Sequence, residues 1–162
     1  MKVLLQRVTK ASVKVDDHIV GSINHGVLLL VGFSAVDTLA GLAPMAAKIV
    51  NLRIFNDAAG KMNLSLLDVP DSAILAVSQF TLLADCRKGR RPSYQNAAPA
   101  EIAAGLFDAF ARELRKVATK VETGTFQAHM EVELVNDGPV TIWLDSEVMR
   151  RVVCDYSKSS IG

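Results

Sequence analysis

The sequence has few of the features that mark specialised classes of protein. Only two cysteines, Cys86 and Cys154, occur in 162 residues, too few for a disulfide framework, so we expect a reducing, cytoplasmic location. No apolar run approaches the roughly 20 residues of a membrane span, and the opening MKVLLQRVTK lacks the apolar core of a signal peptide. We therefore expect no membrane partner. Because the net charge is only +1, a nucleic acid has to be bound through a local basic patch.

Sequence signatures of common catalytic and metal sites are missing as well. There is no glycine-rich phosphate loop and no G-x-S-x-G elbow that would expose a serine nucleophile. The histidines, His18, His25 and His129, are far apart and have no C-x-x-C or H-E-x-x-H partner, so we predict neither a metal site nor a cofactor. A hydrolase that uses Cys86 or Ser78 as its nucleophile is an alternative, because the basic residues that follow Cys86 favour a thiolate.

What the chain does have is the length and apolar content of one globular domain. Its 162 residues, 50% of them hydrophobic, can bury a core without a disulfide or a metal. Apolar patterns predict strands over residues 2–8, 11–15, 27–33, 52–55, 130–135 and 140–144, and a buried apolar run over residues 73–83. Helical spacing predicts one helix after Asp37 or Thr38 and another after Pro99, with apolar residues at steps of four from Ile102 to Leu114. This order of elements predicts a mixed α/β domain with much antiparallel pairing.

Two short segments do not fit these regular patterns. The first is Ser78-Gln79-Phe80-Thr81, at the end of a buried apolar strand. In α/β proteins, ligands bind at the carboxyl ends of strands, where backbone N–H groups can stabilise an oxyanion; a strand that simply reaches the surface is the alternative. The second is the Asn-Asp-Gly-Pro segment at residues 136–139. Proline donates no hydrogen bond to a ladder and so belongs at a bulge, an edge or a turn, with a plain hairpin turn as the alternative.

A third segment is strongly basic. Arg87, Lys88, Arg90 and Arg91 gather four of the 18 basic residues of the chain. Such a concentration of charge can bind the phosphates of a nucleic acid, whereas a solvated loop is the simpler explanation.

The strings SQFTLLADCRKGRRPS (78–93) and NDGPVTIWLDS (136–146) closely resemble the D-aminoacyl-tRNA deacylase family. The opening MKVLLQRVTKASV and the segments 48–66 and 121–139 are similar to it as well, so that the resemblance covers a domain of residues 1–146. It implies a single-domain, three-layer α/β/β fold with mixed, largely antiparallel sheets, assembled as a homodimer. Residues 147–162 extend past the usual end of the family, and we expect them to form a short helix or a tail.

The resemblance also implies an activity, hydrolysis of the ester that joins a D-amino acid to the 3′-terminal adenosine of tRNA. Mischarged glycyl-tRNA would be a substrate too, and L-aminoacyl-tRNA would be rejected, as translational proofreading requires. The bond between Gly138 and Pro139 would be cis, and its loop would enter the pocket of the partner subunit, so that the two subunits share each active site.

By the same resemblance, each site residue has an expected role. The pocket for the adenosine and the ester would be formed by Ser78, Gln79 and Phe80, with Thr81 and Met130 close by. Arg7 would support the Gly-Pro loop, and the basic run would bind tRNA phosphates. The sequence departs from the family at Gln127, where glycine is usual, which bears on the backbone beside the pocket.

The expected chemistry needs no strong base from the protein. An aminoacyl ester is already activated, so positioning and oxyanion stabilisation can suffice. We favour water over the Thr81 hydroxyl as the nucleophile, because no His or Lys motif is at hand to activate Thr81. A non-catalytic RNA-binding module that uses the basic run is the alternative from a different class of function.

Overall fold

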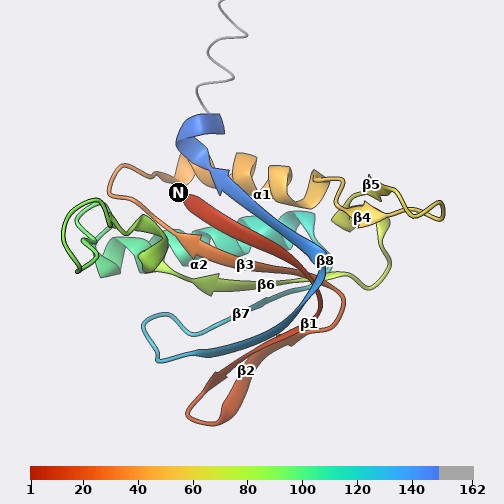
Figure 1. Ribbon diagram of the computed structural model, residues 1–162, viewed down its shortest axis with the longest axis horizontal. Coiled ribbons are helices and arrows are strands. Elements are labelled where there is room, and N and C mark those ends of the chain that lie inside the picture. The colour runs from red at the N-terminus through yellow and green to blue at the C-terminus, as the bar shows by residue number, and fades with distance from the viewer. Residues whose placement is uncertain (150–162) are drawn as a thin grey trace, which may run out of the picture.

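The computed structural model describes residues 1–149, in which a strongly curved six-stranded sheet carries two helices, α1 and α2, on one face (Figure 1). The strands of this sheet are β1 (Lys2–Val15), β2 (His18–Ile23), β3 (Gly26–Gly32), β6 (Ala73–Ser78), β7 (Val121–Thr123) and β8 (Glu131–Asp145). A separate pair is formed by β4 (Phe55–Asn56) and β5 (Met62–Leu64), and the helices are α1 (Leu42–Asn51) and α2 (Ala100–Val117). Residues 146–149 are helical, and the remainder of the predicted tail lies outside the described residues.

Strand β1 organises the sheet because it has neighbours along both edges. One edge pairs with β3 and then with β2, and the other edge pairs with β8 over almost its whole length, all in antiparallel fashion. β3 pairs in parallel with β6, and β6 with β7. The predicted mixed, largely antiparallel α/β domain is confirmed, although residues 2–15 form one strand rather than the two expected.

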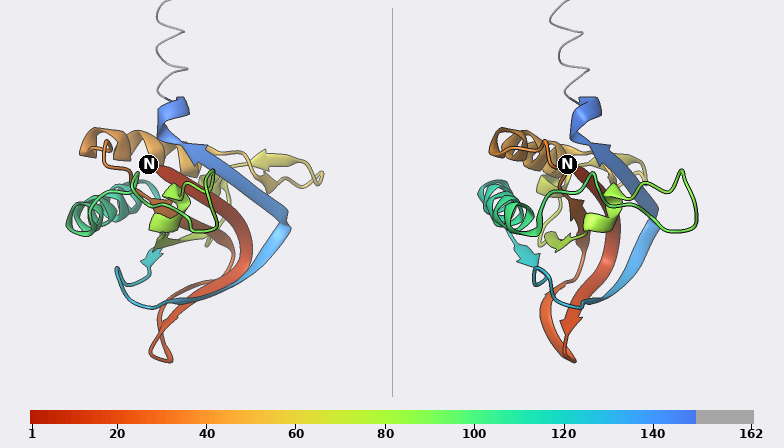
Figure 2. Two further views of the ribbon diagram at one scale, coloured as in Figure 1. Left: turned by 60° about the vertical axis from the view of Figure 1, so that its left-hand side comes forward. Right: turned by 90° about the vertical axis from the view of Figure 1, so that its left-hand side faces the viewer.

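Both faces of β3 and β6 are buried, which explains their continuous apolar sequences. On one face, Val27, Leu29 and Ile74 pack with apolar residues of α1 and α2. On the other face, Leu28 and Leu75 pack with the second half of β1 and with β2 and β8. β2 lies against β6 and β7, because the sheet curls back on itself until it nearly closes into a barrel (Figure 2). The helices, the β3–β6 part of the sheet and its curled part are the three layers.

The helices follow their predicted patterns with two differences. In α2, Phe110 and Leu114 are fully buried, but Ile102 is 54% exposed. With 3.6 residues per turn, steps of four drift by about 40° each, so Ile102 has rotated well away from Leu114. A 3₁₀ turn, η1 (Leu39–Gly41), precedes α1, which therefore begins later than predicted. In the described part of the chain, neither helix has the length and apolarity to cross a membrane.

One predicted strand end is confirmed and one predicted strand start is wrong. Within the apolar run over residues 73–83, the strand ends at Ser78, where the polar segment was expected to end it, and the chain then turns into a 3₁₀ helix, η3 (Phe80–Leu83). The strand predicted over residues 52–55 begins only at Phe55. Before it, the Ile54 N–H donates to the Leu52 carbonyl at 3.0 Å, a tight turn that ends α1 and leaves no room for a strand.

Strand β8 runs through the Asn-Asp-Gly-Pro segment, so the two separate strands and the hairpin turn considered for it are wrong. β8 pairs with β1 on both sides of this segment, with Gln6 opposite Thr141 and Val8 opposite Asn136. β1 advances by two residues there while β8 advances by five, so the extra residues of β8 bulge out of the ladder. This bulge contains the Gly138–Pro139 peptide bond, which is cis.

Candidate active site

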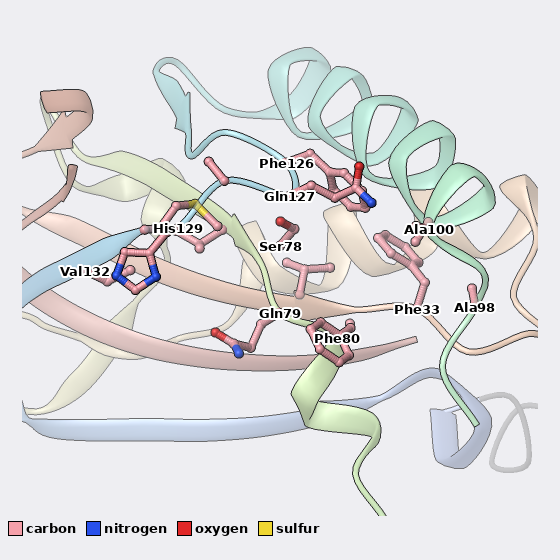
Figure 3. Close-up of a pocket in the computed structure, with 16 residues that line it drawn as sticks. Phe33, Ser78, Gln79, Phe80, Ala98, Ala100, Phe126, Gln127, His129 and Val132 are labelled. Atoms are coloured by element: carbon pink, nitrogen blue, oxygen red, sulfur yellow. The ribbon is translucent and has the colours of Figure 1, made fainter. Parts of the chain in front are cut away.

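A cavity of about 530 Å³ lies at the carboxyl ends of β3 and β6, bounded by the start of α2 and by the segment that leads into β8 (Figure 3). Its walls are mostly apolar. Four residues assigned to a pocket from the sequence, Ser78, Gln79, Phe80 and Met130, line this cavity, and Thr81 follows them directly in η3. The fold thus brings the end of β6 and the start of β8 together, as an active site formed by these residues requires.

Close approach of two backbone segments shapes this end of the pocket. The Gln79 N–H donates to the Val31 carbonyl at 2.7 Å, which holds the end of β6 against β3. Gly32 lets the next turn pack closely, because a Cβ there would lie 2.7 Å from the Gln79 carbonyl oxygen and 2.5 Å from Leu83 Cδ2. η3 then begins at Phe80, and the first N–H groups of a helix have no partner within it. The N–H groups of Phe80 and Thr81 therefore have no partner within η3.

The side chains beside these N–H groups include no strong base. Gln79 Nε2 donates a hydrogen bond to Thr81 Oγ1, and because an amide does not take a proton from a hydroxyl, this contact does not activate Thr81. Of the described residues that line the cavity, only His129 is titratable, and it is exposed. Sequence reasoning considered His129 only as a metal ligand. Within residues 1–149, no three His, Cys, Asp or Glu side chains gather as a metal site would require.

Gln127 stands at the rim of the cavity in a conformation that favours glycine. Its φ is 61°, in the left-handed region that disfavours residues with a Cβ by roughly 1–2 kcal/mol. Gln127 therefore adopts a turn that a glycine would adopt at less cost.

The Gly138–Pro139 loop lies apart from this cavity, with Arg7 packed beneath it. Arg7 is 5% exposed, its Nη1 donates to the Ile54 carbonyl at 2.6 Å, and its Nε lies 2.9 Å from Asp137 Oδ2. The Arg7–Asp137 contact is an ion pair that is too far from linear for a hydrogen bond. A Cβ on Gly138, whose φ is 111°, would lie 2.7 Å from Arg7 Nη2. The guanidinium thus fills the space under the loop, and Gly138 and Pro139 are exposed.

Asn136 closes the base of the loop. Its Nδ2 donates to the carbonyls of Arg7 at 2.8 Å and of Val140 at 3.1 Å, and Thr141 Oγ1 donates to its Oδ1 at 3.3 Å. These bonds replace ladder bonds that the bulge interrupts. Sequence reasoning took Asn136 only as part of the segment that interrupts the strand pattern and missed this support, for which an amide side chain at the edge of a proline bulge was the signal.

The cavity and the loop lie at opposite ends of the central strands. Arg7 is opposite Val27, and Val27 is paired with Ile74, near the starts of β3 and β6. Ser78 is paired with Val31, at the ends of the same strands. The four residues between these levels correspond to about 13 Å of strand, and the loop belongs to β8, on the far edge of β1. Within one chain, the loop therefore does not reach the cavity.

The basic run divides into one paired cation and three unpaired ones. Arg87 donates to Asp85 from Nε at 2.8 Å and from Nη2 at 2.5 Å, and these hydrogen bonds hold the pKa of Asp85 well below its usual range. Lys88, Arg90 and Arg91 are exposed and form no ion pair within residues 1–149. Cys86, at the start of this loop, is exposed and does not belong to the described cavity lining. Arg87 thus shapes the loop, and the other three cations are free to meet a phosphate.

Comparison with known proteins connects this site to a family. Residues 4–145 match the family described as D-Tyr-tRNA(Tyr) deacylase. The chain belongs to this family. It is 61% identical to the D-aminoacyl-tRNA deacylase of Thermomicrobium roseum over 93% of this chain and 97% of that protein, and 55% identical to that of Roseiflexus sp. over 93% and 96%. Membership of the deacylase family confirms the resemblance found in the sequence and the expectation of an enzyme.

Solved structures share the fold of this deacylase-family chain. A c-Myc DNA unwinding element binding protein superimposes with a TM-score of 0.84 at 42% identity, over 90% of this chain and 98% of that chain. A probable eukaryotic D-amino acid tRNA deacylase superimposes with a TM-score of 0.77 at 21% identity, over 89% and 98%. At 21% identity the second likeness concerns the fold alone, which is the one described above.

Proposed function

We propose that this protein hydrolyses the ester between a D-amino acid and the 3′-terminal adenosine of tRNA, as a proofreading enzyme of the cytoplasm. The products are the free D-amino acid and tRNA with its terminal hydroxyl restored. Glycyl-tRNA is a second substrate, and L-aminoacyl-tRNA is rejected. The observation that carries this proposal is the cavity formed by Ser78, Gln79 and Phe80 in a chain whose relatives are D-aminoacyl-tRNA deacylases.

Water is the nucleophile in the proposed reaction. It attacks the ester carbonyl, and the resulting oxyanion accepts hydrogen bonds from the backbone N–H groups of Phe80 and Thr81 at the start of η3. Collapse of the tetrahedral intermediate breaks the bond to the ribose oxygen, which leaves with a proton that the attacking water has given up. The 2′-hydroxyl or the α-ammonium group of the substrate orients the water, and this positioning suits a reactive ester. The amide contact that Gln79 makes to Thr81 supports water over a threonine nucleophile.

A second copy of the chain completes each site in this proposal. The Gly138–Pro139 loop is exposed, is supported by Arg7 and Asn136, and lies away from the cavity of its own chain. In a two-fold homodimer, each loop enters the cavity of the other subunit, which gives two equal sites. The Gly138 carbonyl then accepts a hydrogen bond from the substrate α-ammonium and occupies the space that an L side chain requires. Rejection of L-aminoacyl-tRNA is steric on this account.

Matched substrates test the proposal. The same amino acid is attached in its D and L forms to the same tRNA, and loss of the ester is followed with a catalytic amount of protein. We expect rapid loss from D-aminoacyl-tRNA and from glycyl-tRNA, with L-aminoacyl-tRNA as long-lived as in buffer. Equal rates on the two enantiomers, or no loss from either, would contradict the proposal.

An RNA-binding module without catalysis is the competing function. Lys88, Arg90 and Arg91, which form no ion pair with any residue of the described part of the chain, favour it. It predicts salt-dependent binding of tRNA with no turnover. The same incubation decides between the two, because release of many equivalents of amino acid per subunit is incompatible with binding alone.

A further inference from the structure

Two exposed aromatic rings meet at the mouth of the cavity. Phe80 lines the cavity and is 56% exposed, and Tyr94, outside the lining, is 38% exposed. Their rings meet edge to face, with centroids 5.0 Å apart and planes at 67°. Figure 3 shows Phe80 where η3 leaves the cavity, and the ring contact with Tyr94 extends the aromatic surface past the cavity lining. Exposed aromatic surface of this kind is available to a planar ligand.

The backbone around Tyr94 is held in place although it belongs to a loop. Asp85 and Ser93 exchange two backbone hydrogen bonds, of 2.7 and 2.9 Å, immediately before Tyr94. Just after it, the Ala97 N–H donates to the Tyr94 carbonyl at 3.0 Å. The two rings therefore form a preorganised surface, which lowers the entropy lost when a ligand binds.

Cationic residues lie in the loop next to Tyr94. The same Asp85–Ser93 pair closes the loop that carries Lys88, Arg90 and Arg91. The two ends of the cation-bearing loop thus meet at the residue before Tyr94, whose ring contacts Phe80 at the cavity. Proteins that bind single-stranded nucleic acid combine these elements, aromatic rings that stack on bases and a basic surface that follows the backbone.

We propose that Phe80 and Tyr94 form a platform on which the base preceding the terminal adenosine of the tRNA stacks. This assignment rests on the proposed function, because it requires the terminal adenosine and its ester to occupy the cavity. All tRNAs end in the same CCA sequence, so the contact is the same for every substrate. Tyr94 is a binding residue remote from the ester, and it acts on how tightly the tRNA is held rather than on the chemical step.

Substrates with and without the preceding nucleotide test the platform. For Tyr94→Ala, we expect the KM for D-aminoacyl-tRNA to rise about 5- to 150-fold, the range for one base–aromatic stack, with kcat unchanged. For D-aminoacyl-adenosine, which has no preceding base, KM should stay within about twofold of the wild type. Tyr94→Phe should restore the KM for tRNA, and Leu39→Ala, which removes an apolar side chain that is 65% exposed in η1, should change neither substrate.

A tRNA with an abasic penultimate nucleotide completes a double-mutant cycle. The wild type should lose on this tRNA at least the factor that Tyr94→Ala loses on intact tRNA, because the base also contacts Phe80. Tyr94→Ala should lose a smaller factor on the abasic tRNA than the wild type does. Equal KM changes on tRNA and on D-aminoacyl-adenosine, or losses that multiply in the cycle, would overturn the platform.

Binding of uncharged tRNA separates this inference from the proposed function, since it needs no turnover. Weaker binding by Tyr94→Ala, with Tyr94→Phe equal to the wild type, would support the platform even in a protein that hydrolysed no ester. Equal binding by the wild type and Tyr94→Ala would overturn it even in an active enzyme.

Discussion

One sheet forms two contrasting features. The cavity at the end of β6 is a hollow, and the Gly138–Pro139 loop of β8 is a projection. Each arises where a strand departs from regular pairing, β6 by turning early into η3 and β8 by carrying extra residues opposite β1. The cavity is hollow and its described lining has one titratable residue, His129. The loop is filled from below by the Arg7 guanidinium and tied by Asn136. One chain therefore presents a hollow that it does not fill and a projection that it does not cover, as the two halves of a shared site would.

The largest effect is expected from a change on the cavity side. Gly32→Ala places a methyl group 2.7 Å from the Gln79 carbonyl oxygen, so η3 has to move and take the Phe80 and Thr81 N–H groups with it. Since one lost oxyanion donor lowers kcat by about 100- to 1,000-fold, we expect a fall of that size in single-turnover assays on D-aminoacyl-tRNA. Gly41→Ala is the control, because its new Cβ has no described atom within 4 Å. An equal loss of kcat in both variants would show that Gly32 does not shape the active site.

A change on the loop side should have the next largest effect. Gly138→Ala imposes a side chain at φ 111° against Arg7 Nη2, and a displacement of about 1 Å in a positioning element can lower the rate about 100-fold. We expect kcat/KM on D-aminoacyl-tRNA to fall by about that factor and the preference for D over L to narrow.

Gly60→Ala is the control for backbone strain on the loop side. Gly60 also has a positive φ, 77°, but no described atom lies within 4 Å of its Cβ position. Both variants should lose stability by roughly 1–2 kcal/mol in chemical denaturation, and only Gly138→Ala should lose activity. Full activity of a folded Gly138→Ala protein would show that the loop is not part of the active site.

Substitutions in the basic run (residues 87–91) should weaken tRNA binding and leave the cavity and the Gly138–Pro139 loop unaffected. Replacing Lys88, Arg90 and Arg91 together by Ala should weaken tRNA affinity at least about tenfold and lower the slope of log K against log salt by about two to three. The rate at saturating tRNA should not change. Arg87→Ala is the comparison, and it should lower the slope less because Arg87 is already paired with Asp85. A large fall in the rate of the triple variant at saturating tRNA would show that one of these cations belongs to the active site.

The smallest effect is expected at Thr81. Thr81→Val removes a hydroxyl that accepts from an amide and has no base to activate it, so kcat should stay within about tenfold of the wild type. Removing the nucleophile of a covalent mechanism lowers kcat by about 10⁶-fold. A loss of more than about 10⁴-fold, in a variant with an unchanged melting temperature, would make Thr81 the nucleophile.

Local sequence patterns predicted the elements that depend on neighbouring residues. Continuous apolar runs located β3 and β6, because both faces of these strands are buried, and helical spacing located α2. The failures involve distant partners. The pattern broke β8 at Pro139, whereas pairing with β1 carries the strand past the bulge. Periodicity also could not reveal that Arg87 is bound to Asp85.

The end of the buried apolar run pointed to residues 78–81 as a candidate site, and the family resemblance added Met130 and gave each residue its role. Ser78 and Met130 are far apart in the chain, and neither spacing nor propensity brings them to one cavity. The sequence missed Tyr94, whose ring acquires its place through the backbone pairing of Asp85 with Ser93. Such pairing across a loop leaves no periodic signal to read.

Subunit mixing tests the shared site most directly. Gly32→Ala impairs the cavity and Gly138→Ala the loop, and each protein alone should be nearly inactive on D-aminoacyl-tRNA. After exchange of subunits at equal amounts, half of the dimers combine the two variants, and each of these has one site with an intact cavity and an intact loop. The account predicts recovery of about a quarter of wild-type activity, appearing at the rate of subunit exchange. If cavity and loop acted within one chain, no mixture would recover activity, and that result would contradict the account.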